Sequence, residues 1–333
     1  MRKTFRGRAL GALLPLAAAL LLAACGGSSS SSSSSVSSDT GTVHTLTPTA
    51  SSTAAAAASG PGVGKPPVVL GDKNFTEENI LGALYTQALE AKGFKVTEKD
   101  NIGSSEIIYK ALQAGQIDLY PEYTGTLLTA VANQTTQPTS AAAAYTQAKA
   151  YVQQHGFTLL LPTPFSDSDV LATTPAYASA HSLHSNYDLA KLGKSVKLAG
   201  APEFATRYEG LIGLKKVYGI NPTFVPLAIG LNYNALDSGQ VQVADVFTTD
   251  GQLQSGKYVL LTDPKGVFGF QNVAPVVSQK VLAAEGPAFA STLNAVSALL
   301  TLPAVQKLNA AVTNLKLAPS AVAAQFLKAN GLA

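Results

Sequence analysis

One phrase occurs twice in the chain, and it constrains the fold more than any other feature of the sequence. YKALQAGQIDLYPEYTG occupies residues 109–125, and YNALDSGQVQVADVFTT occupies residues 233–249. The two segments share Tyr, Ala, Leu, Gly, Gln and Thr in the same columns, and Ile/Val, Leu/Val and Tyr/Phe are near matches. Each pattern predicts a helix that ends at a glycine, then a strand and a loop.

The elements around the two copies also follow one order. Residues 68–119 and 196–246 each predict strand, helix, strand, helix, strand, which is typical of parallel α/β units. The sequence therefore predicts two similar α/β lobes with a cleft between them. Ligands of open α/β sheets bind beyond the carboxyl ends of the strands. We therefore expect the loops at 120–126 and 247–251 to face that cleft.

The first long helix is predicted from an apolar period that begins after Thr76. Thr76 is the expected N-cap, and Glu77 and Glu78 suit a first helical turn. The residues expected to form its buried face are Ile80, Leu81, Leu84, Tyr85 and Leu89.

The N-terminal residues are typical of an exported lipoprotein. Four basic residues precede an apolar run at 9–22, which is short for a membrane span of about 20 residues. The following LAACG places Cys25 at a lipobox, so 1–24 is the expected signal peptide and Cys25 the expected lipidation site. Residues 25–67 are rich in Ser, Thr and Ala, and we expect a disordered tether there, too polar to form a core.

Composition and motifs exclude several classes of function. A formal net charge of +3 is too small to indicate a nucleic-acid binder. One cysteine and four histidines, of which only His181 and His184 have helical spacing, complete no metal site, so no metal or other cofactor is expected. The chain has no GxSxG, Walker loop or dinucleotide fingerprint, and we expect no enzyme.

Four segments carry a resemblance to a known family. GDKNFTEENILGALY, NIGSSEIIYKAL, GQIDLYPEYTGT and PEFATRYEGLIGL resemble the substrate-binding proteins of ABC importers for quaternary amines such as glycine betaine, carnitine and choline, including the ProX-like branch. The resemblance implies a type II periplasmic binding protein, in which two α/β lobes close on a ligand about a hinge crossed twice. Residues 68–167 and 274–333 would form lobe I, and 168–273 lobe II.

The resemblance also implies a binding site. Lys73, Thr126 and Arg207 stand where the family holds a ligand carboxylate, and such groups form charge-assisted hydrogen bonds to carboxylates. Tyr123 matches one tyrosine of the family's aromatic cage for the ammonium group. The other cage positions hold Asp169, Phe247 and Gln271, so the cage is only partly aromatic. Phe268 and Phe270 are alternatives to Gln271.

These features predict a lipid-anchored binding protein on the outer face of the cytoplasmic membrane. It would act as a monomer, capture a small zwitterionic or quaternary-ammonium osmolyte, and deliver it to a membrane permease that works with an ATPase. Two alternatives stay open. One is the same fold with another ligand, either ergothioneine-like or non-quaternary, and the other is a sensory lipoprotein without transport.

Overall fold

The structure is a computed structural model that describes residues 60–333. The predicted signal peptide, Cys25 and most of the predicted tether lie outside the described residues.

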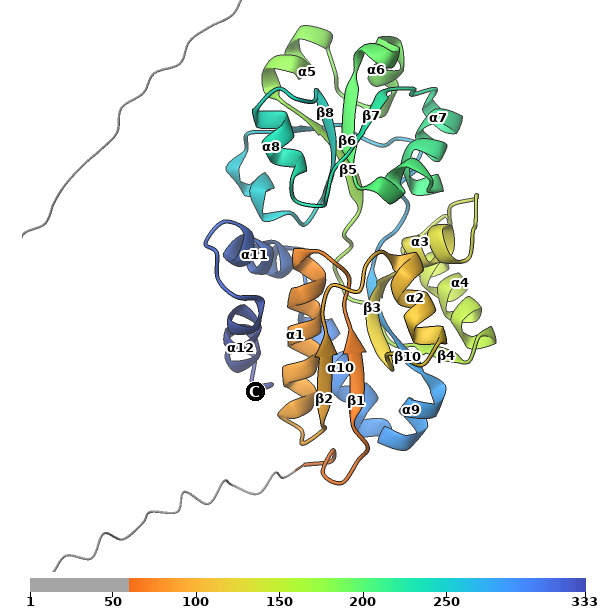
Figure 1. Cartoon of the computed structure of the whole chain (residues 1–333), viewed down its shortest axis with the longest axis vertical. Helices are drawn as coiled ribbons and strands as arrows, with labels where there is room; N and C mark the ends of the chain where they lie inside the picture. The colour runs from red at the N-terminus through yellow and green to blue at the C-terminus, as the bar shows by residue number, and fades with distance from the viewer. Residues whose placement is uncertain (1–59) are drawn as a thin grey trace, which may run out of the picture. The chain divides into compact units, whose positions relative to one another are not determined.

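Two five-stranded sheets form the body of the chain, one in each lobe (Figure 1). The sheet of lobe I has the order β2 (Val96–Lys99), β1 (Val68–Gly71), β3 (Leu119–Tyr123), β10 (Val273–Ser278) and β4 (Phe157–Leu159). The sheet of lobe II has the order β7 (Thr223–Pro226), β6 (Lys197–Gly200), β8 (Val243–Phe247), β5 (Asp169–Thr173) and β9 (Val259–Leu260).

The two sheets have the same internal arrangement. In lobe I, β1 pairs in parallel with β2 and β3, and β10 is antiparallel to β3 and β4. In lobe II, β6 pairs in parallel with β7 and β8, and β5 is antiparallel to β8 and β9. The repeated strands β3 and β8 therefore occupy equivalent positions, which confirms the prediction of two similar α/β lobes.

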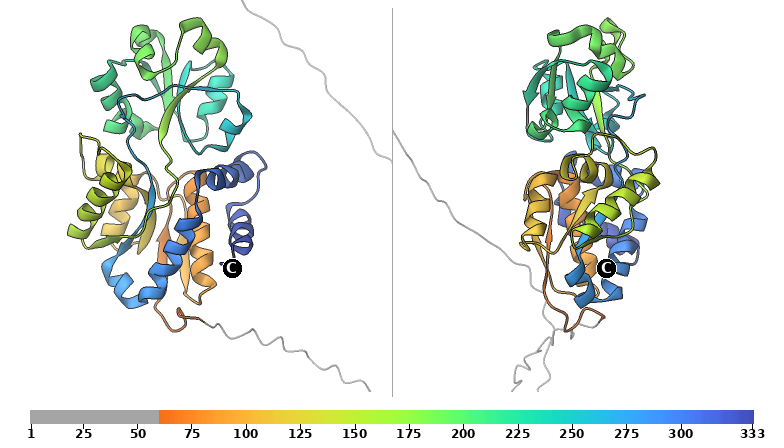
Figure 2. Two further views of the ribbon diagram at one scale, coloured as in Figure 1. Left: turned by 180° about the vertical axis from the view of Figure 1, so that it is seen from behind. Right: turned by 90° about the vertical axis from the view of Figure 1, so that its right-hand side faces the viewer.

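Two segments cross between the lobes. Each ends in a strand, β5 or β10, that pairs antiparallel with the repeated strand of its own sheet, β8 or β3. The first runs from β4 to β5 and the second from β9 to β10. Both crossings are visible between the lobes in Figure 2. They meet at the bridge between Ser166 and Asn272. Asn272 also donates its side-chain amide to the carbonyl oxygens of Thr163 and Phe165, at 3.0 and 2.9 Å. The predicted hinge of two crossings is thus confirmed.

Helices cover both faces of each sheet. Those of lobe I are α1 (Thr76–Glu90), α2 (Ser105–Gln113), α3 (Thr124–Thr126) continued by η1 (Leu127–Val131), α4 (Ala141–Gln154), α9 (Gln279–Glu285), α10 (Pro287–Leu299), α11 (Leu302–Thr313) and α12 (Pro319–Ala329). Those of lobe II are α5 (Pro175–His181), α6 (Asn186–Leu189), η2 (Ala190–Ser195), η3 (Pro202–Ala205), η4 (Tyr208–Ile212), α7 (Gly213–Tyr218), α8 (Asn232–Asp237) and η5 (Gly251–Ser255).

The predicted apolar face of α1 forms the centre of the core of lobe I. All five of its predicted core side chains are at most 2% exposed. They pack with α10, α11 and α12 against one face of the sheet, while α2 and α4 cover the other face. Burial of this face supplies most of the stability of such a helix, because isolated helices of this length are marginal in water.

The prediction that Thr76 is the N-cap of α1 is wrong. Thr76 is the first helical residue, and Phe75 takes the extended N-cap position without a side-chain cap bond. Burial of the first turn explains the difference. The carboxylate of Glu78 accepts a hydrogen bond of 3.2 Å from the backbone N–H of Lys73, so a buried acid links the loop to the helix instead.

The expected end of the tether at residue 67 also needs correction. Residues 60–67 form a turn that is bonded to the body of lobe I. The N–H of Gly62 donates to the carbonyl of Lys92 at 3.0 Å, and Nζ of Lys65 donates to the carbonyl of Ala284 at 2.7 Å. A Cβ on Gly62 would lie 2.2 Å from the backbone nitrogen of Phe94. The glycine permits this close approach, which composition alone does not indicate.

Within residues 60–333, no single helix is both long and apolar enough to cross a membrane. In that part of the chain, only α10 and α11 taken together are long and apolar enough, and they meet at an angle of 88°.

Candidate functional site

A cleft lies between the two sheets, at the edge where the parallel strands end. It encloses about 600 Å³ when its solvent-open part is counted. Tyr123 and Thr126 from the β3 loop and Phe247 from the end of β8 line it. Both loops predicted from the repeated phrase therefore contribute to the cleft.

Aromatic rings from both lobes form one wall of this cleft. Phe75, in the loop before α1, stacks on Phe247 with ring centroids 5.7 Å apart and on Tyr123 with centroids 6.2 Å apart. The hydroxyl of Tyr123 donates to the buried carboxylate of Glu77 at 2.7 Å, which fixes the ring. Phe204 adds a fourth ring from lobe II. Such ring faces attract organic cations.

Lys73 follows β1 and is 3% exposed. Its ammonium group lies 2.6 Å from Oε1 of Glu122, 3.5 Å from Oε1 of Glu78 and 3.4 Å from the carbonyl oxygen of Pro121. It also lies 4.5 Å from the centroid of the Tyr123 ring. Lys73 is therefore already neutralised by carboxylates of its own lobe, as a buried ammonium requires.

Arg207 joins the two lobes across the cleft. Its Nε and Nη2 donate to Oε1 and Oε2 of Glu106, on α2 of lobe I, at 2.9 and 2.8 Å. This is the bidentate geometry in which arginine binds carboxylates most strongly. Burial alone raises the pKa of Glu106, but the hydrogen bonds and charge of Arg207 outweigh burial and lower this pKa to about 2. Nη1 of Arg207 lies 3.7 Å from Oε1 of Glu209.

Carboxylates outnumber cations in the lining of the cleft. The cations are Lys73 and Arg207, and the acids are Asp167, Asp169, Glu203, Glu209 and Asp245.

Burial shifts the pKa values of most of these acids. It raises the pKa of Asp169 to about 7, with Glu209 adding to the shift and Arg207 opposing it. Burial, followed by the neighbouring Asp169, raises the pKa of Asp245 well above its ordinary range. The pKa of Glu209 is also raised by burial, although Arg207 opposes the shift. A cation entering the cleft would stabilise the ionised forms of these groups.

Gln271 is placed behind the cleft, and it does not contribute to the lining. Its Oε1 accepts from the N–H of Thr126 at 2.9 Å, and its Nε2 donates to Oε2 of Glu209 at 3.0 Å. Gln271 therefore links one cleft residue of each lobe from the hinge side. Phe268 and Phe270, the alternatives named for this position, are also absent from the lining.

The structure brings six of the seven predicted site residues to one cleft: Lys73, Tyr123, Thr126, Asp169, Arg207 and Phe247. Sequence reasoning missed Phe75, Phe204, Asp245 and the Glu106–Arg207 pair. The motifs KNFTE and PEFATRY contain Phe75 and Phe204, so an aromatic ring beside each predicted cation was an available signal. Nothing in the sequence pairs Glu106 with a residue 101 positions away.

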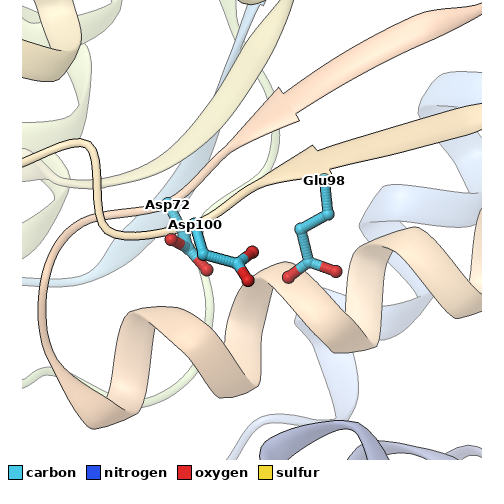
Figure 3. A group of neighbouring side chains, drawn as sticks. All are labelled: Asp72, Glu98 and Asp100. Carbon is cyan, nitrogen blue, oxygen red and sulfur yellow. The ribbon is translucent and has the colours of Figure 1, made fainter.

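A second acidic group lies outside the cleft, beside the carboxyl ends of β1 and β2 (Figure 3). One carboxylate oxygen from each of Asp72, Glu98 and Asp100 lies within 4.8 Å of the others. Asp72 already accepts from the N–H of Asn101 at 2.7 Å and from the side-chain amide of Asn79 at 3.1 Å. Burial raises the pKa of Asp72 to about 6 and that of Glu98 to about 7. We assign no metal to this group, because the proximity of the three carboxylates is the sole support for a metal site there.

Comparison with known proteins identifies the family. Residues 66–329 match the family described as the substrate binding domain of ABC-type glycine betaine transport systems. The glycine-betaine-binding protein of Pseudomonas aeruginosa is 35% identical over 79% of this chain and 88% of its own length. The glycine betaine-binding protein YehZ of Escherichia coli is 31% identical over 80% of this chain and 91% of its own.

Solved structures agree with these relatives. The crystal structure of a glycine betaine/carnitine/choline ABC transporter is 25% identical, with a TM-score of 0.65 over 80% of this chain and 99% of that chain. Apo YehZ from Escherichia coli has a TM-score of 0.56 at 30% identity over 80% of this chain and 99% of that chain. These matches confirm the predicted resemblance and the type II periplasmic-binding-protein fold, and the chain therefore belongs to the family of substrate-binding domains of ABC-type glycine betaine transport systems.

Proposed function

We propose that the chain is a lipid-anchored binding protein that captures a small quaternary-ammonium solute of the glycine betaine, carnitine and choline class and delivers it to a membrane permease. Family membership supports the transport role. The observation that carries the ligand class is the composition of the cleft, where rings from both lobes face an excess of carboxylates.

Several side chains in and behind the cleft have proposed roles. The ammonium group lies against Tyr123, Phe75 and Phe247, because cation–π attraction is strongest where water is excluded. Asp169 supplies a negative charge beside it. The other end of the ligand faces Thr126, which Gln271 positions from behind, and lies beside the Glu106–Arg207 pair.

Delivery follows from the two lobes. The ligand contacts both lobes, so it stabilises the closed arrangement over the open one by its difference in affinity. We propose that the permease recognises the closed pair of lobes and that its ATPase supplies the energy. No covalent chemistry is assigned to this chain.

A thermal-shift panel tests the ligand class. Glycine betaine, choline, carnitine, ergothioneine, proline and a polyamine are added separately to the full chain, because a ligand that binds only the native state raises the melting temperature by mass action. We expect the quaternary-ammonium compounds to raise the temperature and proline to leave it unchanged. A shift with proline or the polyamine alone would contradict the proposal.

The anchor has its own test. Substituting Cys25→Ser removes the thiol that the proposed diacylglyceryl group needs, so the protein should leave the membrane fraction and appear in soluble extracts. Ser35→Ala, in the same serine-rich segment, is the matched control and should stay in the membrane fraction. Equal membrane retention of both variants would contradict the lipid anchor.

A further inference from the structure

We propose that the cleft selects a small organic cation that carries a hydrogen-bond donor and no carboxylate, because Glu106 already occupies the arginine that a ligand carboxylate would need. This inference rests on the proposed function and narrows its ligand class.

The first step concerns Arg207, the strongest anion-binding group in the cleft. Its Nε and Nη2 are both committed to Glu106, at 2.9 and 2.8 Å. Its remaining side faces Glu209, with Nη1 3.7 Å from Oε1. A ligand carboxylate must therefore displace a bidentate carboxylate of the protein, and it would then lie beside a second one. Each charge-assisted hydrogen bond of such a pair is about twice as strong as a neutral one.

The second step concerns Lys73. Its ammonium group has carboxylate or carbonyl oxygens at 2.6, 3.4 and 3.5 Å, from Glu122, Pro121 and Glu78. Two of its three donors make hydrogen bonds, to Glu122 and Pro121, and the carboxylate of Glu78 lies 3.5 Å away as a second counter-charge. Glu122 itself is fully buried and also accepts from Ser105, Tyr120 and the N–H of Tyr123. Moving Lys73 towards a ligand anion would leave this buried carboxylate without its counter-charge.

The third step concerns acceptors that lack donors. Oδ1 of Asp245 is buried and has no hydrogen-bond partner among the described residues, and Oε1 of Glu209 has only the long ion-pair contact of 3.7 Å to Nη1 of Arg207. Both side chains line the cleft, and Asp245 is 3% exposed and Glu209 1% exposed. A buried acceptor without a donor is unfavourable, so this wall is complementary to a ligand that donates. A ligand carboxylate offers only further acceptors.

Together these contacts define which kind of ligand the cleft binds. A cation is attracted by the acids and by the ring faces, and a hydroxyl or N–H group supplies the missing donor. A carboxylated zwitterion would bring a negative charge next to Asp169, Asp245 and Glu209, in a site where water does not screen repulsion fully. Choline and glycine betaine form the matched test pair, since both carry trimethylammonium and they differ in CH₂OH against COO⁻.

The experiment is calorimetric titration of the full protein, purified in the form that its own cell makes. The three probes, at pH 7.5, are choline, glycine betaine and ethyltrimethylammonium. The last probe is choline without its hydroxyl. We expect choline to bind at least tenfold more tightly than either of the others. Glycine betaine binding as tightly as choline, or more tightly, overturns the inference and leaves the proposed function intact. Ethyltrimethylammonium equal to choline overturns the need for a donor. No binding of any probe overturns the proposed function itself.

A variant tests the role of Glu106. Glu106→Gln removes the charge that holds Arg207 and keeps the size of the side chain, so the affinity for glycine betaine relative to choline should rise about tenfold. Glu90→Gln, an exposed acid at the end of α1, is the matched control and should leave this ratio unchanged. Melting temperatures verify that both variants fold. An unchanged ratio in Glu106→Gln overturns the assignment of the selectivity to Glu106.

Discussion

At the scale of single residues, the cleft combines two means of recognising a cation. Ring faces of Phe75, Tyr123 and Phe247 attract it through their quadrupoles, and carboxylates attract it through charge. Ion pairs with protein carboxylates explain why the cationic residues of the cleft do not repel a cationic ligand. Lys73 and Arg207 are each neutralised by carboxylates within 4 Å.

Phe247 gives the first prediction. Phe247→Leu keeps an apolar side chain and removes the ring face, so choline binding should weaken by roughly 1–2 kcal/mol, or about five- to thirtyfold. Calorimetry measures the change. Tyr187→Leu is the control, because Tyr187 is an exposed aromatic residue of lobe II outside the cleft. Equal affinities of wild type and Phe247→Leu would remove this ring from the site.

Asp169 gives a prediction about pH. Burial raises its pKa to about 7, and the ionised form is the one that attracts a cation. Binding should therefore lower this pKa and release a proton. Affinity for choline should rise from pH 5.5 to 7.5 and level off above the pKa of the free protein.

The contribution of Asp169 can be separated from that of its neighbours Glu209 and Asp245. Asp169→Asn should bind choline more weakly at pH 8 and show a smaller change between pH 5.5 and 8. Dissociation constants at four pH values measure this. A variant with the same pH dependence as wild type would assign the titration to the other acids.

At the scale of elements, the two lobes touch closely on the side of α11 and η5. Gly251, at the start of η5 in lobe II, packs against α11 of lobe I, and a Cβ there would lie 2.5 Å from Cα of Ala310. The side chain of Asn314 donates to the carbonyl of Gly251 at 3.0 Å. This contact joins lobe II to lobe I in the structure, so we infer that it favours the arrangement in which the lobes are together.

Gly251→Ala should therefore weaken closure without harming either lobe. A loss of 1.4 kcal/mol in the closed state would lower ligand affinity about tenfold, because only the closed state contacts the ligand from both sides. Titration with choline and small-angle scattering measure affinity and closure together. Ser255→Ala, at the exposed end of the same element, should change neither. Full affinity in Gly251→Ala would show that the contact is not needed for capture.

Element patterns were more predictable from sequence than contacts between lobes. The apolar period of α1 identified its buried face, because helical periodicity depends only on neighbours along the chain. Gly115 and Gly239 end the repeated helices with φ of 66° and 71°, as the phrase predicted. By contrast, the Glu106–Arg207 pair depends on how two lobes dock. The position of Gln271 depends on how the segment between β9 and β10 passes the cleft. No local sequence pattern encodes either of these arrangements.

At the scale of the whole molecule, buried acids determine how stability depends on pH. Burial raises the pKa of Glu78 to about 8, of Glu98 to about 7 and of Asp72 to about 6. The folded protein therefore holds these protons more tightly than the unfolded chain. Their contribution to stability is greatest at low pH and is lost as pH rises from about 4 through these pKa values.

Glu106 acts in the opposite direction. Arg207 lowers its pKa below the ordinary value, so its contribution is lost as pH falls through about 4 towards 2. The melting temperature should consequently be highest near pH 4 and lower at both pH 3 and pH 8.5. Scanning calorimetry measures this profile. Glu98→Gln should raise the melting temperature more at pH 8.5 than at pH 5, and a uniform change at both would contradict the assignment to the acidic group of Figure 3.

The whole account depends on recognition of positive charge by the cleft, and one measurement tests that claim most directly. Choline and 3,3-dimethylbutanol have nearly the same shape and share a hydroxyl, but a neutral carbon replaces the charged nitrogen in the second compound. Calorimetric titration of the full chain with each at pH 7.5 isolates the charge. We expect choline to bind about 100-fold more tightly, since ring faces and carboxylates both act on charge. Equal affinities would show that the cleft recognises shape alone and would contradict the proposed capture of quaternary-ammonium solutes.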